Sequence, residues 1–299
     1  MKNIKDWVLK GIKRGTAVLL AAAMAFAMPG ISGRAADLAG EGTLPNGKSV
    51  YNILLIGSDR RDESWNGNSD VVIVLTLNAD THKLLLTSFM RDLYAEIPGH
   101  GVHKLNYAYA VGGAETLQAT LEGNYEIEID NYAAVDFGTM AEIVDIIGGV
   151  AMDISDEECE VLNGYLISME QEEDQLPGGG EYVLNGYQAV AYMRIRYVGD
   201  NDYERTQRQR SVLKEIFSSL QELEATELTD LVEEVFSEVD NDLGPVGLLK
   251  FMSGLPEYVT YDLEDQRIPY DGLYTSQSEM LVPDFSATIE RLHGAMYGE

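Results

Sequence analysis

The sequence predicts an α/β fold built on a mixed sheet, and three observations support this prediction. Apolar segments of strand length alternate along the chain with segments of helical periodicity. Two of the apolar segments are joined by a link of only four residues, which is typical of antiparallel neighbours. A continuous apolar run also ends in Gly57-Ser58-Asp59, the pattern of a doubly buried strand with a carboxylate at its end.

The expected elements follow one another closely. Strands are expected at 51–57 and 71–78, and Ala79-Asp80-Thr81-His82 links the second strand to a third at 83–89. An irregular stretch is expected around 97–101. The later elements, in order, are a helix at about 114–121, a strand at 132–135, a helix at 139–147, a strand after Gly148-Gly149, an acidic surface excursion over 156–180, helices at 203–220 and around 228–239, and a strand within 258–268.

The N-terminus has the features of a targeting segment. Basic residues precede an uncharged, mostly apolar run over 16–28, whereas a membrane span needs roughly 17 to 25 residues. We therefore expect residues 1–34 to be a signal peptide cleaved near Ala35, or a signal anchor extending through Ile31. In both cases the remainder is exported. Residues 35–49 have the composition of a linker, and residues 50–299 are expected to form one domain.

The composition bounds the function. The formal net charge of −29 argues against nucleic acid as a partner, because a phosphate backbone requires broad positive potential. A single cysteine, Cys159, permits no intramolecular disulfide.

Against this acidic background, residues 194–210 (RIRYVGDNDYERTQRQR) carry five arginines. Arg205 and Gln209 continue the apolar stripe of the helix that follows, so both are expected to point inward. Asn201 or Asp202 would cap that helix, and its N-terminus favours anions.

The spacing of the other four arginines in this segment predicts where their side chains lie. Arg194 and Arg196 would share one face of an extended segment. Arg208 and Arg210 lie off the inward stripe and are expected on the surface. The cluster predicts a local anion site; the alternative is a solvated segment whose arginines pair with the abundant acids.

Carboxylates precede this cluster in the chain. Asp59 and Asp70 bracket one loop, and paired carboxylates near a strand end commonly hold a hard divalent cation. Arg91 and Lys104 follow them. Carboxylates for a metal together with several guanidinium groups indicate a polyphosphate or pyrophosphate site.

A longer ordered pattern runs through the segments NILLIGSD (52–59), SDVVIVLTLN (69–78), SFMRDLYAEIPGHGVHKLNYAYAVGG (88–113), NYAAVDF (131–137), DIIGGV (145–150), LNGYQAVAYMRIR (184–196) and DYERTQRQR (202–210). Over about residues 51–220 the chain resembles the LytR-CpsA-Psr family of cell-wall ligases. The resemblance implies an extracellular three-layer α/β/α domain with a central mixed sheet. It also implies an apolar tunnel for a polyprenyl chain, with the pyrophosphate at its mouth on arginines and Mg²⁺ (or Mn²⁺).

The family's activity is implied in the same way. Its members transfer a glycopolymer, such as teichoic acid or capsule, from a polyprenyl pyrophosphate carrier to a muramic acid hydroxyl of peptidoglycan. A phosphodiester forms and polyprenyl phosphate is released. This resemblance places the protein at the extracytoplasmic face of the membrane, or secreted to the cell wall.

The family's functional residues carry over by motif. Metal ligands would be Asp59 and Asp70, and Arg91 would be a catalytic pyrophosphate contact. The rest of the pyrophosphate cradle would comprise Arg194, Arg196, Arg205 and Gln209, with Lys104 as an addition. Asp202 or Asp92 is the candidate general base.

Two positions depart from the family pattern. Asn68 stands where many relatives carry an arginine, so one basic contact is absent unless Arg60 or Arg61 replaces it. Met90 stands where a proline is common.

Two other functions fit the same residues. The protein could be a secreted polyprenyl pyrophosphate hydrolase in which water replaces the sugar hydroxyl. It could also be a non-catalytic receptor for lipid-linked precursors that regulates wall assembly. The paired aspartates favour catalysis, because a receptor for an anion gains little from additional carboxylates.

Overall fold

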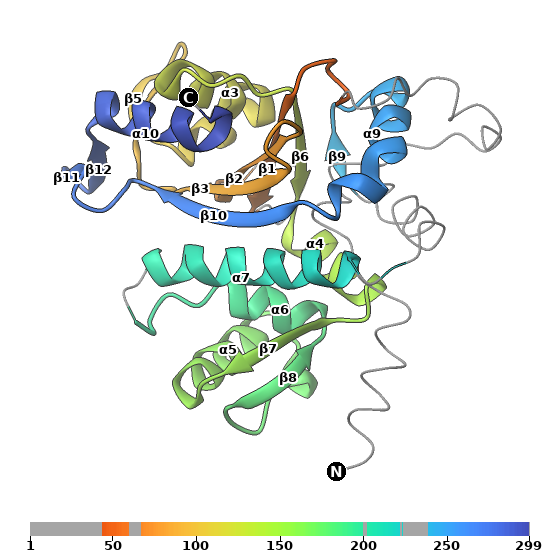
Figure 1. Ribbon diagram of the computed structural model, residues 1–299. Coiled ribbons are helices and arrows are strands. Elements are labelled where there is room, and N and C mark those ends of the chain that lie inside the picture. The colour runs from red at the N-terminus through yellow and green to blue at the C-terminus, as the bar shows by residue number, and fades with distance from the viewer. Residues whose placement is uncertain (1–43, 60–66, 200–201, 222, 224–238, 299) are drawn as a thin grey trace. The chain divides into compact units, whose positions relative to one another are not determined.

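The computed structural model describes residues 44–59, 67–199, 202–221, 223 and 239–298 (Figure 1). The chain divides into two compact units, and each is described here by itself. The sheet unit comprises the described parts of 23–136 and 239–299, and the helical unit comprises those of 137–238. Among the described residues no helix combines the length and the apolar character needed to cross a membrane.

Two of the elements expected from the sequence fall on residues that the structure does not describe. The leader over 1–34 and the helix expected around 228–239, apart from Val239, lie outside the described residues. The boundaries expected for leader, linker and a single domain stay predictions.

A mixed six-stranded sheet forms the centre of the sheet unit, in the order β10-β3-β2-β1-β6-β9. The antiparallel pairs are β1 with β2, β2 with β3 and β6 with β9, whereas β1 with β6 and β10 with β3 are parallel. The α/β class and the mixed sheet are thereby confirmed. Its strands are β1 (Val50–Ser58), β2 (Ser69–Asn78), β3 (Lys83–Phe89), β6 (Asn131–Val135), β9 (Asp240–Asn241) and β10 (Asp262–Ile268).

The first three strands follow directly from their apolar sequences. Nearly every residue of β1, β2 and β3 is buried, as expected for strands covered on both faces. The turn between β2 and β3 is closed by the Asn78 side chain, whose Oδ1 accepts from the Asp80 and Thr81 N–H groups at 3.1 and 3.0 Å. This confirms the expected hairpin.

Helices α3 (Tyr107–Tyr125) and α10 (Phe285–Tyr297) pack against each other and against strands of the sheet (Figure 1). Helix α3 is longer than expected and is kinked at Gly112 and Gly113. Gly113 has φ +66°, a conformation that favours glycine. Helix α9 (Pro245–Tyr258) also belongs to this unit, and its Phe251 ring lies 6.2 Å from that of Tyr51.

Two hairpins complete the sheet unit. Strands β11 (Tyr274–Gln277) and β12 (Met280–Pro283) form one of them. Strands β4 (Tyr94–Ile97) and β5 (Gly101–Lys104) form the other. The irregular stretch expected around 97–101 is the turn over 98–100 between them, and the two flanking strands were not expected. Most residues of β5 are exposed and the strand lacks an alternating apolar pattern, so its sequence gives little signal and its pairing with the β4 backbone identifies it as a strand.

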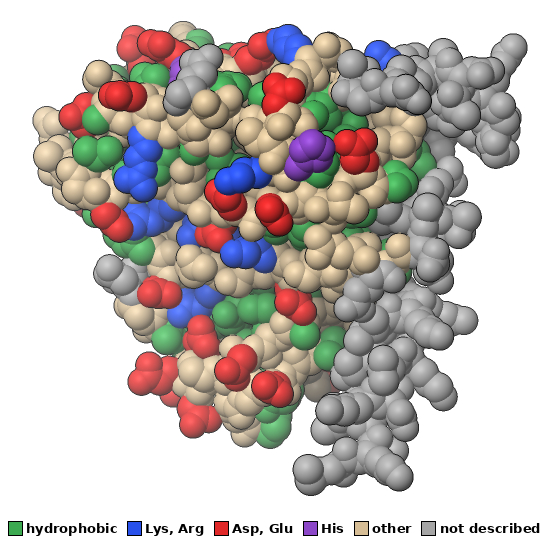
Figure 2. Space-filling model, viewed as in Figure 1, with side chains coloured by type: hydrophobic (Ala, Val, Ile, Leu, Met, Phe, Trp, Pro, Cys, Tyr) green, Lys and Arg blue, Asp and Glu red, His purple; other side chains and the backbone are tan. Residues whose placement is uncertain are grey.

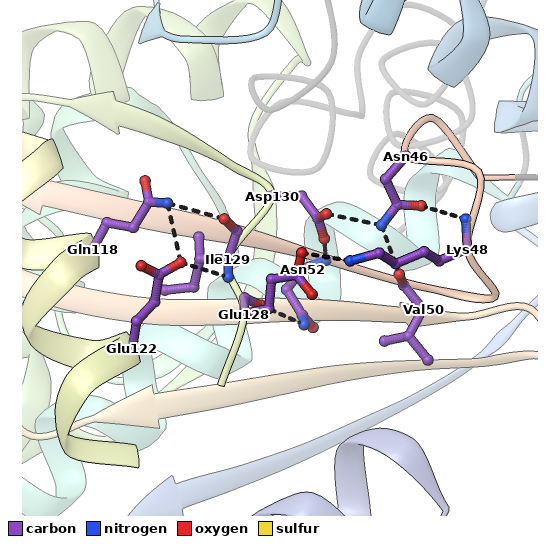
Figure 3. Close-up of polar contacts among 9 residues, drawn as sticks. All are labelled: Asn46, Lys48, Val50, Asn52, Gln118, Glu122, Glu128, Ile129 and Asp130. Carbon is purple, nitrogen blue, oxygen red and sulfur yellow. Dashed lines mark hydrogen bonds and ion pairs between the residues drawn. The ribbon is translucent and has the colours of Figure 1, made fainter. Parts of the chain in front are cut away.

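A polar network ties the start of β1 to the segment before β6 (Figure 3). Asp130 accepts from Asn46 Nδ2 and from the Asn52 N–H, both at 2.8 Å, and Lys48 pairs with Glu128. Burial raises the pKa of Asp130, although these hydrogen bonds act in the opposite direction. The network attaches the first described residues to the sheet.

In the described part of the helical unit, four α-helices pack with a small hairpin. Among the described residues, strands β7 (Val150–Ile154) and β8 (Gly180–Leu184) pair only with each other, so the strand expected after Gly148-Gly149 exists but is not part of the six-stranded sheet. Its helices are α4 (Phe137–Ile146), α5 (Asp156–Ser168), the 3-10 turn Glu172–Asp174, α6 (Gly186–Met193) and α7 (Asp202–Leu220).

The surface excursion expected over 156–180 was wrong for its first half, which is helix α5. Ser155 and Glu158 form a reciprocal capping box at its start, and Leu162 and Leu166 are fully buried. Acidic side chains cover its outer side, and Figure 2 shows Asp and Glu gathered over α5 and the β7–β8 hairpin. Frequent exposed acids concealed the buried leucines in the sequence pattern.

Gly186 allows α6 to approach α4 closely. A Cβ at this position would lie 2.1 Å from the Ala141 carbonyl oxygen. We expect Gly186→Ala to lower the free energy of unfolding by about 1–3 kcal/mol, because backbone must move to relieve the overlap. Urea denaturation measures the change. The matched control is Gly164→Ala in α5, where nothing lies within 4 Å of the new methyl group and stability should not fall. Equal effects of the two variants would contradict the close-approach argument.

Candidate functional site

Four charged side chains of the sheet unit form a chain of ion pairs. Arg91 Nη1 lies 2.8 Å from Asp70 Oδ1, and Arg91 Nε lies 3.6 Å from Asp92 Oδ2. Lys104 Nζ lies 2.7 Å from the other Asp92 oxygen. All four side chains remain partly exposed. The pairing holds each guanidinium and ammonium group in place while leaving solvent access for a ligand.

The sheet brings these residues to one edge. Because β1 is antiparallel to β2, and β2 to β3, the end of β1, the start of β2 and the end of β3 lie side by side. Asp59 follows β1 and Arg91 follows β3. Asp70 is the extra residue of β2 where the register shifts beside Gly57 and Ser58.

Backbone contacts secure the loops that carry the charges. The Asn68 N–H donates to Asp59 Oδ1 at 2.5 Å, and the Asp59 N–H donates to the Asn68 carbonyl at 3.1 Å. The Met90 N–H donates to the Ile268 carbonyl at 3.0 Å. A proline could not make this last bond, so methionine at position 90 joins the Arg91 segment to β10.

The helical unit holds the second group of predicted residues. Arg205 is 2% exposed and Gln209 is 4% exposed, which confirms that both point inward. Asp202, the first residue of α7, lies with Oδ1 3.4 Å from Arg205 Nη1 and 3.7 Å from Arg196 Nε. One carboxylate thus holds two arginines.

The expectation of an extended Arg194–Arg196 pair was wrong. Arg194 is the C-cap of α6 and has helical backbone angles, and no strand includes Arg196. The Arg194 guanidinium instead lies over the Phe137 ring, 4.6 Å from its centroid, and over the Tyr165 ring at 4.9 Å.

The expectation that Arg208 and Arg210 lie on the surface was also wrong. They are 5% and 4% exposed. Arg208 Nε lies 2.8 Å from Glu158 Oε1, and its terminal nitrogens donate to the carbonyls of Ile195 and Val198 at 3.4 and 3.2 Å. Arg208 therefore joins α5 to the loop that carries Arg194 and Arg196. No signal in the sequence connects Glu158 with this loop, because the contact depends on how α5 meets α7.

Burial by itself would raise the pKa of Glu158. Hydrogen bonds from the Ser155 N–H, the Arg208 guanidinium and the Ser155 hydroxyl outweigh it, so that the pKa lies below its usual range. Burial raises the pKa of the neighbouring Tyr192 hydroxyl to about 12. Glu158 is consequently charged and Tyr192 neutral at physiological pH.

The carboxylates at the sheet edge are few for a cation site. Within the described part of the chain, no group of three or more His, Cys, Asp or Glu side chains could hold a metal ion. Asp59 and Asp70, two carboxylates at one sheet edge, fit a hard cation only if a ligand supplies further oxygens. Arg60, Arg61 and Asn201 lie outside the described residues.

The fold and these charged groups define a class: an α/β protein with a mixed sheet and carboxylates and arginines clustered at strand and helix ends. The profile of the LytR_cpsA_psr family matches residues 31–292. The chain therefore belongs to the LytR_cpsA_psr family.

Individual relatives agree with this assignment. Biofilm regulatory protein A of Streptococcus mutans is 30% identical over 244 residues, covering 74% of this chain and 58% of that protein. The polyisoprenyl-teichoic acid–peptidoglycan teichoic acid transferase TagU of Enterococcus faecalis is 36% identical over 175 residues, covering 57% and 54%. The chain thus spans little more than half the length of these two relatives.

Solved structures show the same fold. The family protein YwtF (TagT) with bound octaprenyl pyrophosphate lipid aligns with a TM-score of 0.63 and 22% sequence identity, covering 86% of this chain and 97% of that chain. At this identity the likeness establishes the fold.

Proposed function

We propose that this protein is a phosphotransferase that attaches a polyprenyl-pyrophosphate-linked glycopolymer to peptidoglycan through a phosphodiester. One observation carries the proposal: Arg91 is held at the sheet edge between Asp70 and Asp92, in a segment that matches the family. The names of two relatives support the substrate class, one a teichoic acid transferase and the other a structure with bound octaprenyl pyrophosphate.

The proposed reaction transfers the phosphoryl group that carries the glycopolymer from the polyprenyl phosphate to a sugar hydroxyl. A hydroxyl oxygen of the peptidoglycan sugar bonds to the phosphorus next to the glycopolymer. The bond from this phosphorus to the bridging oxygen breaks, and polyprenyl phosphate leaves with that oxygen. The hydroxyl proton passes to a carboxylate, for which Asp202 and Asp92 are the candidates. No co-reactant is required.

The chain's own residues would bind and orient the pyrophosphate. Arg91 would donate N–H groups to phosphoryl oxygens, where negative charge must be stabilised during transfer, and Lys104 would add a positive charge. In the helical unit, Arg194, Arg196, Arg205 and Gln209 are proposed as further phosphate contacts. Asp59 and Asp70 would hold Mg²⁺ or Mn²⁺, and a bound divalent cation supplies Lewis-acid neutralisation of phosphate charge.

The proposal also concerns location. The basic and apolar leader over 1–34 would direct the protein across the membrane and either be removed or retain the protein there. We propose that it acts at the extracytoplasmic face of the membrane, where its lipid-linked substrate and peptidoglycan meet.

The test uses the purified full chain, a polyprenyl-pyrophosphate-linked oligosaccharide and peptidoglycan fragments, with Mg²⁺ varied. The wild type should form a covalent glycan–peptidoglycan product. Asp59→Asn keeps an acceptor for the Asn68 N–H but removes a charge, so it should require at least about tenfold more Mg²⁺ for half-maximal rate. Asp80→Asn, in the β2–β3 turn, should behave as wild type.

Other outcomes would identify another function. Release of phosphate without labelled peptidoglycan would favour the hydrolase. Tight lipid binding without any turnover would favour the receptor. Full transfer after complete chelation of divalent cations would overturn the metal assignment alone.

A further inference from the structure

Two exposed aromatic rings stack where strand β5 leads into helix α3 (Figure 1). The ring centroids of His103 and Tyr107 lie 4.6 Å apart, and the ring planes meet at 42°. Tyr107 is 39% exposed, and His103 is exposed as well. We call this pair the aromatic platform. Single exposed apolar side chains are common on proteins, but here each ring restrains the other, so an ordered apolar surface faces solvent.

The hairpin that carries the platform is held in place. Asn124 of α3 donates from Nδ2 to the Glu96 carbonyl at 2.9 Å, and its Oδ1 accepts from the Glu96 N–H at 3.0 Å. On the side of β5 that His103 occupies, the other residue is Gly101, which has no side chain. A Cβ at Gly101 would meet nothing within 4 Å. The space beside the rings is therefore open to a ligand.

The platform adjoins the chain of ion pairs at the sheet edge. Lys104, a member of that chain, directly follows His103. Asn106 directly precedes Tyr107, and its N–H donates to the Arg91 carbonyl at 3.1 Å. Successive residues of a strand point to opposite sides, so His103 and Lys104 lie on the two sides of β5. A ligand on the platform would thus be a neighbour of one held by Arg91 and Lys104, in a separate place.

The chemistry of the platform suits an uncharged sugar. One face of a sugar ring presents C–H groups that pack on the electron-rich face of an aromatic ring, while its hydroxyls stay available for hydrogen bonds. A polyanionic glycopolymer is less suited, because the chain has a net charge of −29 and Glu96 is exposed on the same hairpin. The sugar rings of a peptidoglycan glycan strand carry no charge of their own. Since that strand is a polymer, one sugar can reach the sheet edge while its neighbour rests on the platform.

We propose that His103 and Tyr107 form a subsite for a sugar ring of the peptidoglycan acceptor, next to the sugar whose hydroxyl attacks the phosphorus. This inference rests on the proposed function, because that function makes peptidoglycan the acceptor. It names a binding surface outside the proposed pyrophosphate contacts.

The experiment uses the full chain and soluble peptidoglycan glycan chains. Calorimetry gives the dissociation constant of the glycan chains without lipid, and initial rates give their KM at saturating lipid-linked oligosaccharide. We expect Tyr107→Ala to raise both constants by about five- to tenfold, because the sugar loses its stacking face. The value of kcat should stay within about twofold of wild type, since the lost contact is made equally before and during transfer. His103→Ala, which removes the supporting ring, should have a smaller effect in the same direction.

Two control variants accompany these changes. Tyr107→Phe keeps the ring and should behave as wild type. Ile167→Ala removes a 51% exposed apolar side chain from α5 and should also leave both constants unchanged. Thermal unfolding of each variant reports on the fold.

The two readouts separate the possible failures. Unchanged constants in Tyr107→Ala would overturn the subsite while the proposed function stands. Weaker binding of the lipid-linked oligosaccharide, with normal binding of the glycan chains, would also overturn it and would assign the platform to a sugar of the glycopolymer. Binding of glycan chains that requires Tyr107, without any transfer by the wild type, would overturn the proposed function and leave the sugar site standing.

Discussion

Replacing Arg91 with alanine is expected to lower the turnover number for glycopolymer transfer by at least about 100-fold, the usual cost of removing one donor that stabilises charge in a transition state. Arg91 is the residue of the sheet edge that contacts both Asp70, at 2.8 Å, and Asp92, at 3.6 Å. Its removal takes away a positively charged donor at the sheet edge and leaves less positive charge beside the Asp70 and Asp92 carboxylates, although Asp92 keeps its pair with Lys104. The measurement is the initial rate of product formation at saturating lipid substrate.

Two further variants make this result interpretable. Arg91→Lys keeps the positive charge but not the planar set of donors, so it should recover only part of the lost rate. Arg291→Ala is the matched control, because Arg291 is exposed on α10 and stacks on Tyr270 at 4.0 Å. A rate for Arg91→Ala within a factor of a few of wild type would remove Arg91 from the catalytic assignment.

Breaking the pair of Arg208, which is buried, and Glu158, which is mostly buried, is expected to have the largest effect on stability. The two side chains are 6% and 14% exposed, and their charged atoms lie 2.8 Å apart. Replacing one partner leaves the other charge buried, which costs about 3 kcal/mol of unfolding free energy. We therefore expect Arg208→Met and Glu158→Gln each to be strongly destabilised in urea denaturation.

The double variant and an exposed pair serve as controls. Arg208→Met combined with Glu158→Gln should be less destabilised than the sum of the single changes, because no buried charge is left without its partner. Lys83→Gln breaks an exposed pair with Glu264 and should leave stability nearly unchanged. Additive single effects would show that the two residues do not act as a pair.

The same pair should make stability depend on pH. The pKa of Glu158 is lowered in the folded protein from its usual value of 4.5. Its contribution is therefore fully present above that value and is lost as the pH falls through the lower, folded-state pKa. The difference in unfolding free energy between wild type and Glu158→Gln should be largest near neutral pH and shrink in acid. A difference that does not change between neutral pH and strong acid would contradict this assignment.

Replacing Arg208 should also remove two hydrogen bonds that hold the loop carrying Arg196. Arg208 donates to the carbonyls of Ile195 and Val198, on either side of Arg196. This contact explains why a helix position outside the inward stripe is buried. It could not be predicted from the spacing of Arg208 on its own helix, since the partners come from α5 and from the loop before α7.

Local sequence patterns predicted the features that depend on residues within a single strand or helix. Continuous apolar runs located β1, β2 and β3 to within two residues at each end. Helical periodicity placed Arg205 and Gln209 inward, because positions four apart share a face of one helix. The family motifs are also linear, and the match over residues 31–292 confirms the family that they indicated.

Contacts between distant segments were decided by the tertiary structure alone. The β4–β5 hairpin depends on backbone pairing, which carries little side-chain signal. The aromatic support of Arg194 joins positions 137, 165 and 194 from three helices. The sequence thus determined the α/β class, the family and the candidate charged residues, because each is encoded in local order. Only the tertiary structure decided which partner holds each arginine, because an ion pair or a ring contact forms where separate elements pack together.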